Sequence, residues 1–200
     1  MLYLSEMKRL LTILILIFTL QTPSWADDIR DFQIEGMSIG DSLLKYMSKK
    51  QIEHELNNTD ITVFYPDNKF AGISLFVIKN SFEIYDDVGV IIKPNDKNFK
   101  IFGLEGTLFF GQDIKKCYEK QNEIFNEFKV IFGNKYKVNS WDSKNPEKYL
   151  KIVKYKDFNS DTNEQARVIC YDSREGFERK VDSLYVVLNS SEFVTFQRQN

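Results

Sequence analysis

The sequence predicts an α+β fold, an antiparallel sheet or sheets with helices packed on one face. Residues 113–132 place apolar side chains at three- and four-residue steps, which is the spacing of an amphipathic helix. Short runs rich in β-branched and aromatic residues lie before and after this segment, separated by turn residues. Strands and helices do not alternate one by one, so the runs favour an antiparallel sheet over a parallel one.

The first half should form a helix followed by strands. Gly36 and Gly40 bracket a turn, and Asp41 or Ser42 can cap the helix that follows. The apolar stripe of this helix breaks near Ser48, where a second short helix is expected to begin. Strands are then expected at 61–65, 70–78, 82–93 and 99–110, and the turn KPNDKN joins the last two.

The second half repeats this order. The helix at 113–132 should end at Gly133-Asn134. The polar stretch YKVNSWDSKNPEK is expected to be a loop, and a Ser cap in the tail NSSEFVTFQRQN predicts a short closing helix. Strands are expected at 149–158, 166–171 and 183–188. No low-complexity linker interrupts the chain, so residues 27–200 should form a single domain, or two packed halves, 27–112 and 113–200.

The N-terminus has the three-part layout of a secretory signal. Lys8 and Arg9 precede the uncharged run Leu10–Leu20, and small residues before Asp27 predict cleavage between Ala26 and Asp27. The alternative is a retained anchor, but a membrane span needs roughly 20 apolar residues. We therefore expect residues 1–26 to be a signal peptide, no stable membrane span after cleavage, and a periplasmic or secreted location.

Composition and charge narrow the range of partners. The predicted signal carries Lys8, Arg9 and Glu6, so its removal takes the formal net charge from −2 to −3. This balance gives no reason to expect nucleic acid or an anionic membrane surface as a partner. The 17 Phe and 10 Tyr residues predict an aromatic core. The stretch MKRLLTILILIF also reads as a natural start, so the chain begins at Met1 or at Met7.

The two cysteines are expected to form a disulfide, because paired cysteines persist in an oxidising compartment. Cys117 lies on the apolar stripe of the helix at 113–132, and Cys170 lies in the strand-like run ARVICYDS. Such a bridge stabilises a fold by about 4 kcal/mol on the chain-entropy model. Two buried free thiols are the alternative. A nucleophilic Cys117 would need a neighbouring base, and no spacing links it to His54, the one histidine.

One stretch imitates a calcium loop. In DFNSDTNEQARV, four ligand-type residues stand at loop positions 1, 3, 5 and 7, namely Asp157, Asn159, Asp161 and Asn163. The required glycine and bidentate glutamate are replaced by Thr162 and Val168. The stretch is therefore interpreted as a polar loop between two strands, and no metal site is predicted.

No catalytic or cofactor-binding residue is predicted. The carboxylates of Asp86-Asp87 and of Glu35 and Asp41 are interpreted as solvated charges or helix caps, because nothing fixes the separation of a catalytic pair. The chain has no phosphate-binding glycine loop, no GxSxG and no HExxH. Trp141 and Phe177 lie in polar stretches, where aromatic residues serve either as binding anchors or as lids on the core.

Four stretches carry a resemblance: MKRLLTILILIF, FQIEGMSIGDSLLKYMSKKQI, KPNDKNFKIFGLEG and DIKKCYEKQNEI. Together they resemble a group of small exported proteins from AT-rich marine bacteria, which implies periplasmic residence and no mechanism. GMSIGDSLL is also similar to the start of the first helix in BamE-type outer-membrane-assembly lipoproteins, although the lipid-site cysteine of those proteins is missing.

The sequence favours a non-catalytic periplasmic binding or interaction module whose partner is an envelope protein or a small ligand. The alternative is a small periplasmic hydrolase with a site assembled from scattered residues. A pocket that gathers several polar groups would favour the enzyme, and a shallow apolar surface would favour the binding module.

Overall fold

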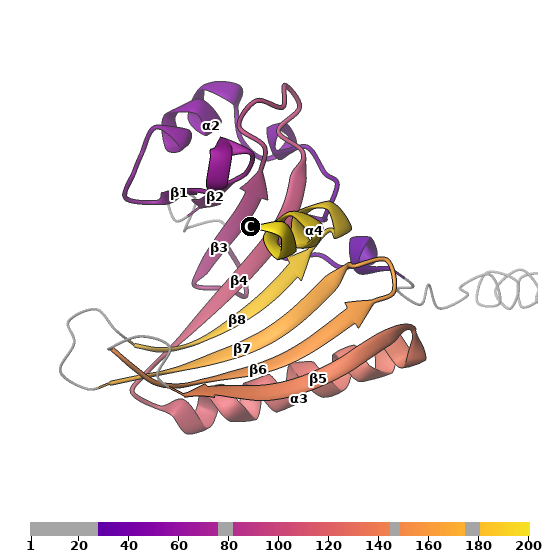
Figure 1. Cartoon of the computed structure of the whole chain (residues 1–200). Coiled ribbons are helices and arrows are strands. Elements are labelled where there is room, and N and C mark those ends of the chain that lie inside the picture. Colours follow the sequence, from indigo (N-terminus) through magenta and orange to yellow (C-terminus); the bar gives the residue numbers. More distant parts are fainter. Residues whose placement is uncertain (1–27, 76–81, 145–148, 175–180) are drawn as a thin grey trace, which may run out of the picture.

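The computed structural model describes residues 28–75, 82–144, 149–174 and 181–200. Within these ranges one antiparallel sheet of eight strands runs in the order β1-β2-β3-β4-β8-β7-β6-β5 (Figure 1). The strands are β1 (Thr62–Phe64), β2 (Ala71–Ser74), β3 (Asp87–Ile92), β4 (Ile101–Gly111), β5 (Tyr136–Lys144), β6 (Leu150–Ser160), β7 (Gln165–Ser173) and β8 (Asp182–Asn189). The helices are α2 (Lys49–Leu56), α3 (Ile114–Phe132) and α4 (Ser191–Gln199). The predicted α+β class is confirmed.

The two halves of the chain follow the same plan. Each half is a helix followed by four strands that pair in sequence, α2 with β1 to β4 and α3 with β5 to β8. The last strands of the two halves, β4 and β8, pair at the centre of the sheet, with Leu104 opposite Leu188. The sheet is therefore continuous, and its two ends are β1 and β5.

The helical start of the first half breaks where the sequence predicts. A 3₁₀ helix, Leu43–Lys45, is capped by Ser42, whose Oγ accepts a hydrogen bond from the N–H of Leu44. Ser48 then caps α2 in a capping box with Gln51. Because a capping serine has extended φ and ψ, the chain turns at Ser48 instead of continuing one helix.

Helix α3 covers one face of the sheet, which we call the α3 face. Asp113 caps its first turn, and Gly133 follows its last residue with φ +53°. Its buried residues are Cys117, Gln121, Phe125, Phe128 and Phe132. The Gln121 side chain donates hydrogen bonds of 2.9 Å to the carbonyls of Lys154 and Val168, which satisfies its buried amide N–H groups.

Helix α4 packs on the opposite face, the α4 face, so the prediction that helices pack on one face is wrong (Figure 1). On β3, Val90 and Ile92 point into the core beneath α3, whereas Ile91 points to the other side. There Ile91 joins an apolar cluster with Phe70 and Phe102. Phe193 and Phe196 of α4 cover this cluster.

The stretch predicted as a loop, 136–148, contains β5. Tyr136–Lys144 pairs with β6 over its whole length and forms one end of the sheet. A strand with a partner on only one side carries more polar residues than a central strand, so its composition resembled that of a loop. Residues 145–148 lie outside the described ranges. The first-half strands also begin later than predicted; β3, for example, begins at Asp87.

Several sequence predictions fall outside the described ranges. The predicted signal peptide, its cleavage site between Ala26 and Asp27, and Phe177 all lie in residues that the structure does not describe. In the part of the chain that it does describe, no helix combines the length and apolarity that a membrane crossing requires.

Candidate functional site

An aromatic ladder crosses the α4 face. Neighbouring strands place Trp141 opposite Tyr155, Tyr155 opposite Ile169, and Ile169 opposite Tyr185. The rings of Trp141 and Tyr155 stack in parallel, with centroids 3.8 Å apart. Trp141 is 45% exposed although it belongs to a paired strand. The register of β5 to β8 therefore aligns side chains that are distant in the sequence in one row, with Trp141 at its exposed end and Ile169, 5% exposed, buried in its middle.

A polar ladder lies beside the aromatic one. It runs across four adjacent strands: Asp157 lies opposite Arg167, Arg167 opposite Val187, and Val187 opposite Glu105. Arg167 holds Asp157 through two hydrogen bonds of 3.1 Å, from Nε to Oδ1 and from Nη2 to Oδ2. The Trp141 Nε1–H donates to Asp157 Oδ2 at 3.2 Å. This network neutralises Arg167 and fixes the orientation of the Trp141 ring.

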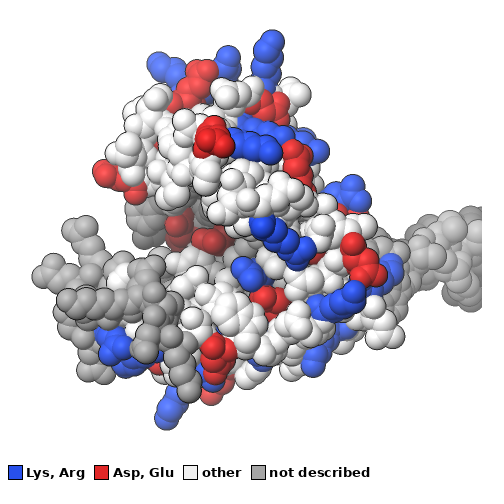
Figure 2. All heavy atoms as spheres, viewed as in Figure 1, with Lys and Arg blue, Asp and Glu red and all other residues white. Residues whose placement is uncertain are grey.

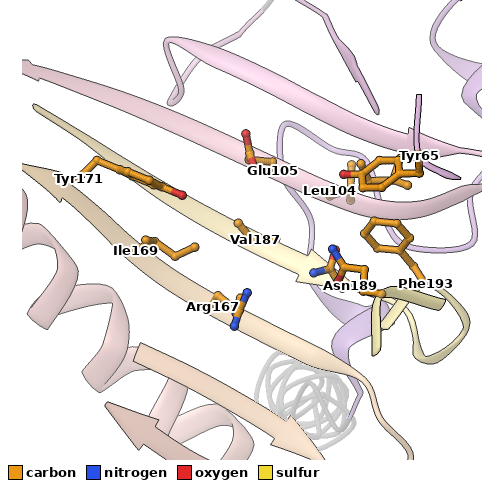
Figure 3. Close-up of a pocket in the computed structure, with 11 residues that line it drawn as sticks. Tyr65, Leu104, Glu105, Arg167, Ile169, Tyr171, Val187, Asn189 and Phe193 are labelled. Carbon is orange, nitrogen blue, oxygen red and sulfur yellow. The ribbon is translucent and has the colours of Figure 1, made fainter. Parts of the chain in front are cut away.

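The polar ladder leads into a pocket of about 190 Å³ (Figure 3). Strands β4, β8 and β7 form its floor, with Glu105, Val187 and Arg167 side by side. Tyr65 and Phe193 stand at one end of the pocket, and Tyr171 stands at the other. In Figure 2 the surface is hollowed here, and acidic and basic atoms lie within the hollow.

Glu105 carries the one uncompensated charge of this pocket. Among the described residues, no hydrogen bond or ion pair to its carboxylate is found. Gly89, the residue opposite on β3, has no side chain to cover it; a Cβ there would lie 3.8 Å from Glu105 Oε1. Burial, together with the negative charge of Asp87, raises the pKa of Glu105 to about 7.

Asp87, by contrast, is held by the protein. Its two carboxylate oxygens accept hydrogen bonds of 2.9 and 2.8 Å from the hydroxyl of Ser74, and the Val88 N–H donates to Oδ1 at 2.8 Å. The surrounding phenols are less acidic than usual. Burial, and to a smaller extent the Glu105 charge, raise the pKa values of Tyr65, Tyr171 and Tyr185.

The predicted disulfide is present between Cys117 and Cys170, whose Cα atoms lie 6.1 Å apart. It joins α3 to β7 on the α3 face, behind the pocket. Both sulfurs are used in the bridge, which rules out the two alternatives, buried free thiols and a nucleophilic Cys117. His54 lies on the exposed surface of α2.

The stretch that imitates a calcium loop is the hairpin between β6 and β7, in agreement with the prediction of a loop joining two strands. Its first residue, Asp157, is engaged by Arg167 and Trp141, and Asn163 adopts φ +66° in the turn. Within the described ranges, no three His, Cys, Asp or Glu side chains are grouped to hold a metal ion.

The other carboxylates singled out from the sequence support loops. Glu35 accepts hydrogen bonds from the backbone N–H groups of residues 83–85, at 2.7 to 2.9 Å, so it is neither a solvated charge nor a helix cap. These bonds lower its pKa against the opposing effect of burial. Asp41 accepts from the N–H of Ser38 and the hydroxyl of Tyr46, and Asp86 accepts from the N–H of Phe109.

Sequence reasoning kept Trp141 as a candidate and missed Glu105. The available signal was a single acidic residue inside the apolar stretch IFGLEGTLFF, bracketed by Gly103 and Gly106. A charge in a central strand needs a compensating group or a function.

Comparison of the chain with protein-family models, curated proteins and solved structures finds no match. The candidate site therefore rests on its geometry alone.

Proposed function

We propose that this protein is an exported, non-catalytic binding module that holds a peptide segment of its partner across the α4 face. The observation that carries the proposal is the aromatic ladder from Trp141 to Tyr185. Aromatic side chains provide a large contact area at low entropic cost, which is why they dominate binding surfaces. The signal-like N-terminus and the disulfide support an extracytoplasmic location.

The shape of the surface favours a chain over a compact molecule. From Trp141 the row of paired residues crosses β5, β6, β7, β8 and β4 to Thr107. Ile169 and Thr107 are buried, so the accessible part of the row lies at the Trp141 and Tyr155 end, where an extended segment can lie across the strands.

One observation favours the alternative, a small hydrolase. Glu105 has a raised pKa and lies near a second carboxylate, Asp87, as the acid and base of a glycosidase do. Asp87, however, is engaged by Ser74 and Val88, which leaves it poorly placed to attack a substrate. A hydrolase would show turnover that disappears in Glu105→Gln; the binding module predicts no turnover that depends on Glu105.

An arrayed library of random octapeptides tests the proposed function. We expect the wild-type protein to select a subset of the library, and Trp141→Ala to bind that subset at least tenfold more weakly. The matched control is Val138→Ala, which removes a 40% exposed side chain from the same strand but on the α3 face. Val138→Ala should bind like the wild type. Equal binding by Trp141→Ala, or no selection by the wild type, would contradict the proposal.

A further inference from the structure

We propose that the Glu105 pocket is the subsite for a single aliphatic ammonium group of the bound chain, that of a lysine side chain. The inference rests on the proposed function, because it takes the α4 face as the binding surface. It adds the chemical identity of the group that must enter the pocket.

The size of the pocket limits what it can accept. Its volume is about 190 Å³, whereas pockets for drug-sized ligands span roughly 300–1,000 Å³. It can therefore take one side chain rather than a whole small molecule. It also opens from the polar ladder, so a chain lying across β7 and β8 could direct a side chain into it.

The charges of the pocket select a cation. Arg167 is neutralised by Asp157, so Glu105 is left as the uncompensated group in the described part of the site. An anionic ligand would be repelled, and a neutral one would leave the carboxylate without a partner at the cost of further desolvation. An ammonium group supplies the missing charge and three donors in a compact head.

The walls suit the same group. Tyr65 and Phe193 line one end of the pocket and Tyr171 the other, and the faces of aromatic rings attract cations. Their apolar surface can also contact the methylene stem of a lysine. The bare backbone at Gly89 leaves the carboxylate accessible from the β3 side.

Ammonium binding in this pocket should depend on pH. The charged and titratable groups around Glu105 are Asp87 on β3, Arg167 on β7, and the phenols of Tyr65, Tyr171 and Tyr185. The phenols stay neutral near pH 7, because their pKa values lie above the ordinary value of 10. Glu105, with a pKa of about 7, is the group that changes charge between pH 5 and 8.

Three probes test the inference on the ¹⁵N-labelled full chain: the peptide Ac-Gly-Lys-Gly-NH₂, the same peptide with Nε-acetyllysine, and n-butylamine. We expect the lysine peptide to shift the amide signals of Glu105, Arg167 and Val187, and the acetylated peptide to bind at least tenfold more weakly. Binding of the lysine peptide should weaken at least tenfold from pH 8 to pH 5, because lysine stays charged while Glu105 becomes protonated.

Two variants distinguish binding in the pocket from a general effect of the net charge. Glu105→Gln should lose at least tenfold in affinity for the lysine peptide, and its residual binding should not change with pH. The control Glu53→Gln changes net charge equally on the exposed surface of α2 and should bind like the wild type. Shifts at the pocket with n-butylamine but not with the lysine peptide would contradict the assignment of the pocket to a lysine side chain of a bound chain.

Equal affinities for the lysine and acetyllysine peptides would overturn the inference. Such a result, with shifts confined to Trp141 and Tyr155, would leave the proposed binding face standing while rejecting the ammonium subsite. Absence of any shift with all three probes would also overturn it. The proposed function is then tested separately, by binding of the wild type and Trp141→Ala to the octapeptide library.

Discussion

Replacing Cys117 or Cys170 with alanine should lower the free energy of unfolding by about 4 kcal/mol. The bridge joins residues 53 apart in the sequence, and on the chain-entropy model closing such a loop in the unfolded state stabilises the fold by about that amount. Both cysteines are fully buried, so each substitution also leaves a small cavity between α3 and β7. Denaturant unfolding under oxidising conditions measures the effect.

The double variant is the decisive control. Because one bridge is lost in every case, Cys117→Ala with Cys170→Ala should cost about as much as either single change. The wild type measured in reductant should lose a similar amount. A double-variant cost close to the sum of the two single costs would mean that the cysteines stabilise the fold separately.

Replacing Glu105 with glutamine should stabilise the protein by about 2 kcal/mol at pH 8 and have little effect at pH 4. The pKa of Glu105 is raised in the folded state from an ordinary 4.5 to about 7. Each pKa unit corresponds to about 1.4 kcal/mol, and partial solvent access reduces the total.

The direction of the pH effect follows from proton binding. At pH 4 Glu105 is largely protonated in both the folded and the unfolded protein, so it does not lower the free energy of unfolding. Between about pH 4.5 and 7 the unfolded state releases the proton while the folded state keeps it, so stability falls as pH rises. Above about pH 7 the loss is complete, and Glu105→Gln removes it. Urea unfolding at pH 4 and pH 8 measures both effects.

If Glu105→Gln were less stable than the wild type at both pH values, the carboxylate would have a stabilising partner and the ammonium subsite would lose its basis. Gly103→Ala is a useful contrast on the same strand. A Cβ at Gly103 would lie 2.7 Å from Ile91 Cγ1 and 2.9 Å from Asn189 Oδ1, so this change should destabilise the fold at every pH.

The sequence predicted those parts of the fold that depend on local signals. The apolar stripe and the terminal glycine of α3 lie within one segment, so Cys117 and Gly133 were placed correctly. The disulfide was predicted from the signal-like N-terminus, which implies an oxidising compartment, together with the position of Cys117 on the helix stripe and of Cys170 in a short strand. The face that α4 covers was missed, because Phe193 and Phe196 suit either face and only the position of Phe70 and Phe102 decides it.

The candidate site was less accessible to sequence reasoning. Trp141 was recognised as a potential anchor, but its strand was taken for a loop. Its stacking on Tyr155 depends on the pairing of β5 with β6, and the rest of the ladder depends on two further pairings. The exposure of the Glu105 carboxylate depends on Gly89, and its raised pKa depends in part on Asp87, both on the neighbouring strand. Such long-range registers do not follow from composition or local periodicity.

The fluorescence of Trp141 tests most directly whether the α4 face is the binding surface. The chain has two tryptophans, and Trp25 lies in the predicted signal peptide, so in protein that begins at Asp27, or in a Trp25→Phe background of the full chain, all tryptophan emission comes from Trp141. We predict that a peptide selected from the octapeptide library changes this emission in a saturable way, with the affinity measured by an independent method. A selected peptide that binds tightly without changing the Trp141 emission, and whose amide shifts map to α3, would contradict the account.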